Sequence, residues 1–313
     1  MLSIVVPVYG SAAIIPRLVA EVQSAMVAEG MAGQFELVLV NDASPDQSWS
    51  VIREMASAHA FVRGINLRRN AGQHNATMAG LHHVRGDVVV IMDDDLQHPP
   101  EAIGGMLRAL DGGFDICYTR YINRKHAWWK RAGSRFNDLV ANLLLDKPRG
   151  LYLSSLKAMR REIADEVIKY DGPYTYIDGL ILNITRSITT VDIVHQDRLE
   201  GSSNYSLRKL VSLWLKMATS FSILPLRIAT YLGFAISALS IVVILFVIAT
   251  KLLHPDFPPG WASLIATILL IGGVQTLCIG MVGEYLGRTY LKMNGKQQFV
   301  VRTTTWTGPR LYD

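Results

Sequence analysis

Three consecutive carboxylates follow an apolar run in the segment VVVIMDDDLQHPP, residues 88–100. Adjacent like charges repel, so Asp93, Asp94 and Asp95 contribute little to stability unless a cation lies among them. Side chains alternate along a strand, which places Asp93 and Asp95 on the same side and turns Asp94 away. Hard carboxylate oxygens suit Mg²⁺ or Mn²⁺ bound to substrate phosphates, and Gln97 offers a further neutral oxygen. The spacing therefore indicates a divalent cation site.

Two other polar residues follow apolar runs in the same way. Tyr9 comes directly after the run 2–8, and Asp42 lies just beyond the run 35–40. In open α/β sheets, ligands bind outside the carboxyl ends of the parallel strands. We therefore expect Tyr9, Asp42 and the acidic triplet to meet at one edge of a sheet.

Short apolar runs rich in β-branched residues recur along the first part of the chain and alternate with segments of helical spacing. These runs are LSIVVPV, FELVLV, GINL, DVVVIM and FDICYT (2–8, 35–40, 64–67, 87–92 and 114–119). The alternation predicts βαβ units, a mainly parallel sheet and the α/β class. In NDASPDQSW, Ser44 is the expected N-cap of a helix that begins at Pro45, with Gln47 completing a capping box.

Two long uncharged segments follow in the second part of the chain. Residues 228–250 form 23 positions without a charge, about 34 Å as a helix at roughly 1.5 Å per residue, and 260–283 form the second segment. Their connector is short and rich in proline, so a transmembrane hairpin is predicted, with a pair of soluble core helices as the alternative. Basic residues flank the outer ends and place both termini in the cytoplasm: Arg208, Lys209, Lys216, Arg227, Arg288, Lys292, Lys296 and Arg302.

Composition agrees with a partly membrane-embedded chain. The 313 residues are 50% hydrophobic with a mean hydropathy of +0.23, and the net charge is +5 with a pI of about 9.2. Such a charge suits nucleic acid, anionic lipid or phosphorylated substrates. Cys117 and Cys278 lie far apart in the sequence and lack the spacing of metal ligands, so we expect neither a disulfide framework nor a zinc site.

We divide the chain into a catalytic domain (1–205), an amphipathic juxtamembrane helix (206–226), the hairpin (227–287) and a cytoplasmic tail (288–313). The juxtamembrane segment carries apolar residues at helical spacing beside basic ones. It fits equally a helix lying on the membrane and a helix packed on the catalytic domain or a sister subunit.

A basic segment, RYINRKHAWWKRAGSRF (120–136), carries six Lys and Arg residues and no acid. Arginine forks match phosphate oxygens, so the segment suits an anionic substrate. Contact with anionic lipid headgroups is the alternative reading for part of it.

Four motifs in this order and spacing, IVVPVYG, LVNDASPDQS, NAGQHNATMAGL and MDDDLQHPP, resemble the inverting glycosyltransferase family 2 with its GT-A fold. Within that family, RLEGSSNYSLRKL, the hairpin and GMVGEYLGRTY resemble the membrane-anchored polyprenyl-phosphate glycosyltransferases, a branch related to dolichol-phosphate mannose synthase and bacterial undecaprenyl-phosphate sugar transferases.

The resemblance implies a set of site residues. Nucleotide-sugar binding falls to Pro7, Tyr9, Asp42, Asp93 and Gln97, with Asp95, Gln97 and Asp93 associated with the metal. Acceptor phosphate binding falls to Arg120 and Arg131, followed by Arg198, Ser203 and Tyr205. Asp95, Arg120, Arg131 and Arg198 are the residues expected to carry catalysis.

The chain departs from the family pattern at two places. Relatives commonly have alanine at the position of Asp94, and many have an acidic D-x-G-x-F segment where this chain has RGLYLSSLKAMRRE (149–162). Other residues stay open: Asp178 contacts sugar or begins a helix, and His74 and His98 are expected to form loop hydrogen bonds.

The resemblance implies inverting, metal-dependent transfer of a sugar from a nucleotide-sugar to a polyprenyl (undecaprenyl) phosphate. The enzyme would span the bacterial inner membrane more than once and hold its catalytic domain in the cytoplasm. It would form a homo-oligomer and bind no nucleic acid. The alternatives are another acceptor, or a non-catalytic membrane scaffold with a degenerate transferase domain. A processive polysaccharide synthase is disfavoured because its Q-x-x-R-W segment is missing.

Overall fold

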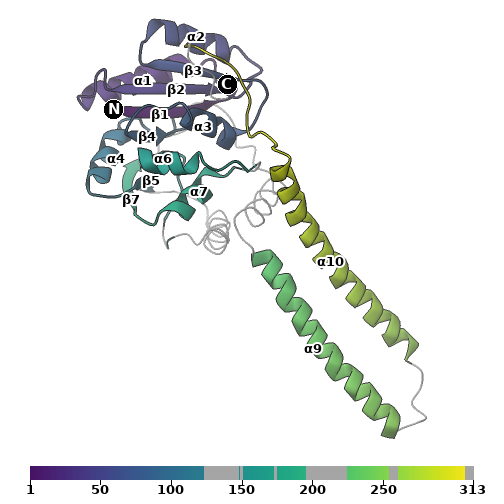
Figure 1. Cartoon of the computed structure of the whole chain (residues 1–313). Helices are drawn as coiled ribbons and strands as arrows, with labels where there is room; N and C mark the ends of the chain where they lie inside the picture. Colours follow the sequence, from purple (N-terminus) through teal and green to yellow (C-terminus); the bar gives the residue numbers. More distant parts are fainter. Residues whose placement is uncertain (123–147, 149–150, 173–174, 195–223, 254–259, 307–313) are drawn as a thin grey trace. The chain divides into compact units, whose positions relative to one another are not determined.

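The computed structural model describes residues 1–122, 148, 151–172, 175–194, 224–253 and 260–306. The chain divides into two compact units, each considered by itself (Figure 1). The first contains Met1–Tyr205 together with Lys296–Asp313, and the second contains Ser206–Gly295.

The first unit is built on an eight-stranded mixed sheet of order β7-β5-β6-β4-β1-β2-β3-β8. β1 pairs in parallel with β2 and β4, and β2–β3 and β5–β7 are also parallel, whereas β6 and β8 run antiparallel to their neighbours. Each of the five predicted apolar runs overlaps a strand, which confirms the α/β class. The strands are Leu2–Val8 (β1), Phe35–Asn41 (β2), Val62–Leu67 (β3), Val88–Ile91 (β4), Ile116–Ile122 (β5), Lys157–Arg160 (β6), Ile188–Val194 (β7) and Val301–Thr304 (β8).

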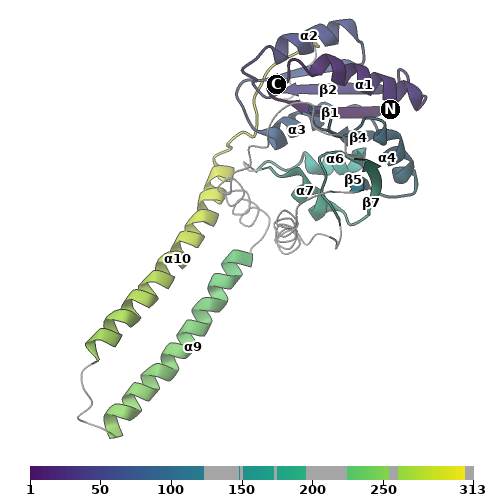
Figure 2. The ribbon, with the colours of Figure 1, turned by 180° about the vertical axis from the view of Figure 1, so that it is seen from behind.

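Helices cover both faces of the sheet (Figures 1 and 2). In α1 the buried residues recur at intervals of three and four, as an amphipathic helix on a sheet requires. α3 packs closely on β1, because a Cβ added at Gly80 would lie 2.3 Å from the Val5 side chain. The helices are Ile15–Ala28 (α1), Ser48–Ala58 (α2), Gln73–Leu81 (α3), Ala102–Asp111 (α4), Arg161–Val167 (α6) and Ile177–Ile184 (α7).

The predicted start of the second helix is wrong. α2 begins at Ser48 instead of Pro45, and no side chain caps it. Ser44 Oγ instead accepts a hydrogen bond from Gly10 N at 3.2 Å and donates to Val8 O at 3.4 Å. The Ser44 hydroxyl therefore bonds the loop that follows β1 instead of capping the helix, which explains why the local sequence signal misplaced the helix start.

The second unit contains two long helices, α9 (Leu224–Leu253) and α10 (Trp261–Met293). Both are long and apolar enough to cross a membrane, over Ala229–Thr250 and Leu270–Met293, and neither stretch is buried within the protein. A pair of soluble core helices would bury such residues, so their exposure favours the membrane hairpin. The second apolar stretch extends beyond the predicted end at residue 283.

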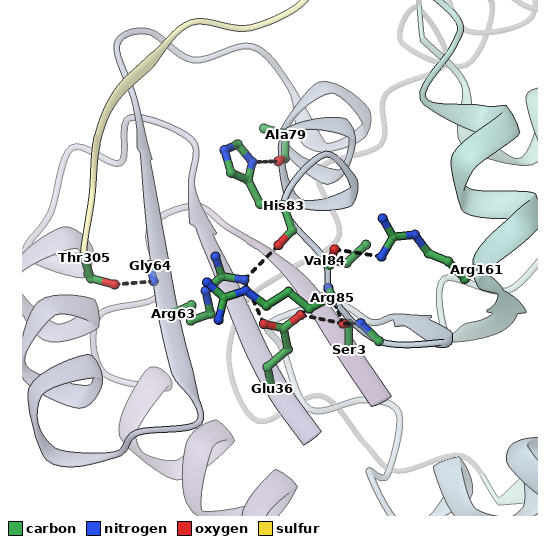
Figure 3. A network of polar contacts seen from close by, with 11 residues as sticks. Ser3, Glu36, Arg63, Gly64, Ala79, His83, Val84, Arg85, Arg161 and Thr305 are labelled. Atoms are coloured by element: carbon green, nitrogen blue, oxygen red, sulfur yellow. Dashed lines mark hydrogen bonds and ion pairs between the residues drawn. The ribbon is translucent and has the colours of Figure 1, made fainter. Parts of the chain in front are cut away.

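Residues after the hairpin add a strand to the sheet of the first unit. β8 pairs antiparallel with β3, and Thr305 Oγ1 accepts a hydrogen bond from Gly64 N at 2.9 Å (Figure 3). The guanidinium of Arg63 lies 3.9 Å from the centre of the Trp306 ring. The sequence analysis assigned this region to a tail and did not foresee the strand.

A buried ion pair between Glu36 and Arg63 joins β2 to β3 (Figure 3). The Glu36 side chain is only 3% exposed, and its carboxylate accepts from Arg63 Nη1 at 2.8 Å, from Ser3 Oγ at 2.6 Å and from Arg85 N at 2.6 Å. Arg63 Nη1 also donates to His83 O at 2.8 Å. These contacts tie β1, β2 and β3 to the chain that leads into β4.

Replacement of Arg63 by alanine should destabilise the protein strongly, because Glu36 would stay buried without its cation. Breaking a buried pair costs about 3–5 kcal/mol, which corresponds to a melting temperature lower by roughly 10 °C in a domain of this size. Thermal unfolding of the full chain in detergent measures the change. Arg53→Ala, at an exposed position of α2, is the control, and equal melting temperatures for the two variants would contradict the prediction.

Candidate active site at the carboxyl edge of the sheet

A cavity of about 320 Å³ lies where β1, β2 and β4 end. The structure brings together around it five residues singled out by the sequence: Pro7, Tyr9, Asp42, Asp93 and Asp95. Asp94, which was expected at the same sheet edge but directed away from the metal, also lines it. Four residues that the sequence analysis did not assign to the site line it as well: Val8, Asn70, Gly72 and Gln73.

Asp42 holds the loop that forms one wall of this cavity. Its Oδ1 accepts from Ala71 N at 2.6 Å and its Oδ2 from Gly72 N at 2.9 Å. Gly72 has a φ of +87°, a conformation that glycine adopts without steric cost. Burial raises the pKa of the Asp42 carboxyl, against the two amide hydrogen bonds. Asp42 therefore shapes the cavity as well as lining it.

Asp93 is the most strongly perturbed carboxyl of the cavity. Its Oδ1 accepts a hydrogen bond from Gln73 Nε2 at 2.6 Å. Burial raises the pKa of Asp93 to about 6, with added repulsion from Asp95 and Asp94 and with opposing effects of a Ser155 hydrogen bond and the Lys157 charge. A cation at this position would relieve both the desolvation and the repulsion.

Asp94 holds the loop that follows β1. Its Oδ2 accepts from Ser11 Oγ at 2.5 Å and from Tyr9 N at 3.2 Å, so its carboxylate is directed at the loop after β1. Strand alternation, from which the sequence analysis expected Asp94 to turn away, is not the reason for this direction, because β4 ends at Ile91 and the three aspartates lie beyond it and line one cavity. No sequence signal identified Ser11 as the partner of Asp94.

Backbone strain accompanies the site carboxylates. Among the described residues, the two non-glycine positions with positive φ are Ala43, at +51°, and Leu96, at +54°. Each adjoins a site aspartate, and such conformations cluster at functional sites. The turn at Leu96 allows Gln97 N to donate to Asp95 Oδ1 at 3.1 Å. Gln97 itself does not line the cavity.

The cavity suits a divalent cation that completes its coordination with substrate oxygens. Four carboxylates and no Lys or Arg lie among the described residues that line it. No three His, Cys, Asp or Glu side chains in the described ranges are arranged to hold an ion by themselves. Mg²⁺ characteristically takes one or two carboxylates together with substrate phosphates, and this donor set fits that pattern.

The predicted acceptor residues are only partly within the described ranges. Arg120 lies on β5 and forms a two-pronged pair with Asp192 of β7, with N–O distances of 2.6 and 2.9 Å, which raises the pKa of Arg120. It lines neither this cavity nor the adjoining one. Four other predicted residues fall outside the described residues: Arg131, Arg198, Ser203 and Tyr205.

A second polar cavity, of about 290 Å³, adjoins the first and shares Gln73 and Asp93 with it. Lys157 and Asp178 form a buried ion pair there. Lys157 lies within the segment 149–162 that departs from the family pattern. The sequence analysis missed Lys157, because its four-residue strand, KAMR, holds two cations and carries no recognisable motif.

Affinity for Mn²⁺ should fall as the pH is lowered through 6. An aspartate with a pKa of about 6 is ionised at pH 7 and largely neutral at pH 5, so a proton competes with the cation and affinity drops by about tenfold over this interval. Electron paramagnetic resonance of Mn²⁺ mixed with the full chain measures the free ion. Asp93→Asn should bind more weakly at pH 7 and lose most of the pH dependence. Constant wild-type affinity from pH 5 to pH 7 would refute the assignment.

Comparison with known families gives two matches on separate parts of the chain. The model described as "Glycosyl transferase family 2" matches residues 3–168, and the model described as "GtrB C-terminal hairpin" matches residues 224–289. The first covers the strands β1 to β6 and the residues that line the first cavity, and the second covers α9 and most of α10.

One similar protein spans both matches, and a solved structure shares the fold. An undecaprenyl-phosphate 4-deoxy-4-formamido-L-arabinose transferase from Enterobacter sp. (strain 638) is 30% identical over 98% of this chain and 94% of its own length. Glucosyl-3-phosphoglycerate synthase from Mycobacterium tuberculosis, crystallised with Mn²⁺, UDP-glucose and phosphoglyceric acid, is 21% identical with a TM-score of 0.50, over 70% of this chain and 77% of that one.

The fold expected from the resemblance, a GT-A domain followed by a two-helix hairpin, is thereby confirmed. One family match spans more than half of the chain, and a 30% identical relative aligns along nearly all of it. The chain is therefore a membrane-associated transferase and belongs to glycosyl transferase family 2.

Proposed function

We propose that the protein transfers a sugar from a nucleotide-sugar to a polyprenyl phosphate, with inversion and with Mg²⁺ or Mn²⁺ as cofactor. One observation carries the proposal. A relative named as an undecaprenyl-phosphate sugar transferase aligns with the catalytic domain and the hairpin together, and the cavity with four carboxylates lies within the matched domain.

The first cavity is the proposed donor site. Pro7, Tyr9 and Asp42 would contact the nucleoside, and Asp93 and Asp95 would lie at the diphosphate. Gln97 is a weaker metal candidate, because it does not line the cavity. The Mycobacterium synthase of similar fold was crystallised with Mn²⁺ and UDP-glucose, which agrees with a metal-assisted donor site.

The acceptor chemistry needs no strong protein base. A phosphate monoester has a second pKa of about 6 and is mostly dianionic at pH 7. Its oxygen would form a bond to the anomeric carbon as the bond from that carbon to the diphosphate breaks, and the nucleoside diphosphate would leave as an anion. A bound divalent cation stabilises the negative charge of that leaving group. The protein must then hold two anions close together, which requires cations near the acceptor.

Those cations remain a proposal. Arg120, Arg131 and Arg198 would bind the acceptor phosphate, with Ser203 and Tyr205 as further donors. Arg120 pairs with Asp192 in the structure, so it would have to leave or share that carboxylate to bind phosphate.

Membrane attachment suits an acceptor with a long apolar tail. Along α9 and α10 the described large side chains are mostly exposed, which matches lipid contact. We place the catalytic domain and both termini on the cytoplasmic side of a bacterial inner membrane, because basic residues flank the outer ends of the hairpin. We also propose that the protein forms a homo-oligomer.

Replacement of Asp95 by alanine should abolish transfer while the protein stays folded. The test uses the full chain, Mn²⁺, undecaprenyl phosphate and labelled UDP-, GDP- and dTDP-sugars, and measures label that enters the organic phase. Asp111→Ala, at an exposed helix end, is the control and should keep wild-type activity. Near-normal transfer by Asp95→Ala would exclude the metal role. Wild-type labelling of a different acceptor alone would exclude the lipid phosphate.

Replacement of Asp94 by alanine should weaken binding of the nucleoside diphosphate. The loop that carries Tyr9 would lose its carboxylate anchor, and hydrogen bonds to a charged group contribute about 1.5–3 kcal/mol, or roughly tenfold or more in affinity. Calorimetric titration of UDP, GDP and dTDP with Mn²⁺ measures the effect. Asp94→Asn keeps an acceptor oxygen and should lose less. Identical affinity of Asp94→Ala and wild type would show that Asp94 does not support the site.

A further inference from the structure

The second cavity lies directly beyond the carboxylates of the first. It is formed by α3, the end of β4, residues 152–155, β6 and the start of α7. Gln73 and Asp93 line both cavities, so a ligand that passes Asp93 enters the second one. A volume of about 290 Å³ corresponds to roughly ten water molecules at about 30 Å³ each. This is room for one sugar ring.

The floor of this cavity is polar and well buried. The side chains of Lys157 and Asp178 are 5% and 9% exposed, and Lys157 Nζ donates to Asp178 Oδ1. Tyr118, which is fully buried, donates its hydroxyl to the same oxygen at 2.9 Å. Burial, followed by the charge of Asp178, raises the pKa of Tyr118 well above its usual value, so its hydroxyl remains a donor.

Protein stability does not explain why such a pair is retained. An apolar pair of similar volume often replaces a buried ion pair without loss of stability. The hydrogen bonds recorded for Asp178 in the described part of the chain all end on Oδ1. Its second oxygen and the remaining ammonium protons of Lys157 are groups that hydroxyls of a ligand can satisfy.

The cavity offers no spare cation to a second anion. Of the charged side chains among the described residues that line it, Asp93 lies at the metal position of the first cavity, and Lys157 and Asp178 pair with each other. His74 adds no charge at neutral pH, because burial lowers its pKa to about 4. Its ring meets that of Tyr176 edge to face, with centroids 5.1 Å apart.

We propose that this second cavity binds the sugar of the donor, and that the Lys157–Asp178 pair selects an uncharged sugar over one that carries a carboxylate. The inference rests on the proposed function, because it takes the nucleoside and diphosphate to occupy the first cavity. Asp178 accepts hydrogen bonds from sugar hydroxyls, whereas a carboxylate on the ring is repelled by Asp178 and finds Lys157 already paired with it.

The first test uses the wild-type full chain in nanodiscs with Mn²⁺ and no acceptor, by calorimetric titration. The ligands are pairs that differ only at C6 of the sugar: UDP-glucose and UDP-glucuronate, UDP-galactose and UDP-galacturonate, GDP-mannose and GDP-mannuronate, and dTDP-glucose and dTDP-glucuronate. In every pair that binds, the uncharged sugar should bind at least tenfold more tightly. Equal or tighter binding of the uronates would overturn the inference.

The second test uses Asp178→Asn, which keeps the shape and removes the charge. The preference for the uncharged sugar should fall at least tenfold, whereas affinity for UDP, GDP or dTDP alone should change less than twofold. Asp111→Asn, on the exposed end of α4, should change neither quantity. An unchanged preference in Asp178→Asn, or equal losses for nucleotide and nucleotide-sugar, would show a merely structural role and overturn the inference.

The nucleotide controls separate this inference from the function on which it rests. If UDP, GDP and dTDP all fail to bind the wild type, with or without a sugar, the donor site is wrong and both proposals fail. If a nucleotide binds with Mn²⁺ but its two sugars bind equally well, the donor site stands and the sugar inference alone is refuted.

Discussion

Mutual repulsion of carboxylates around one cavity is the constraint on which the rest of the site depends. Asp42, Asp93, Asp94 and Asp95 line a space with no Lys or Arg among its described residues, and burial raises the pKa of Asp93 to about 6. Charges held in this way cost free energy unless donors or a cation compensate them. Donors within the protein meet each of them in part: the amides of Ala71 and Gly72 at Asp42, the Ser11 hydroxyl at Asp94, the Gln73 side-chain amide at Asp93 and the backbone N–H of Gln97 at Asp95. A divalent cation beside Asp93 and Asp95 would relieve the repulsion that these donors leave.

The compensating contacts also give the cavity its walls. Each carboxylate that accepts a backbone amide fixes a loop, so the loops after β1 and before α3 are held by the same groups that create the negative potential. The charge and the shape of the cavity are therefore coupled, and a substitution that removes the charge of Asp42 or Asp94 also releases the loop that this carboxylate holds.

The segment after the hairpin contributes to this support from outside the cavity. Gln297 O accepts from Arg69 Nη2 at 3.2 Å, just before the loop that Asp42 holds. Gln298 Nε2 donates to Tyr170 O and Gly172 O at 2.7 and 2.9 Å, in the chain that leads to α7 and Asp178. One short segment thus contacts the supports of both cavities, and β8 secures it to the sheet edge. Residues 297–306 are in this way part of the same compact unit as the two cavities.

The sequence by itself determined the features that depend on local pattern. Short β-branched runs predicted five strands, and two long uncharged segments predicted the hairpin, because each signal is contained within a few consecutive residues. Only the tertiary structure decided the contacts between distant segments. It moved the start of α2 to Ser48 because Ser44 bonds the loop after β1, it added β8 to β3, and it joined Lys157 to Asp178. No periodicity encodes such pairs, since their partners are chosen by how the sheet brings remote residues together.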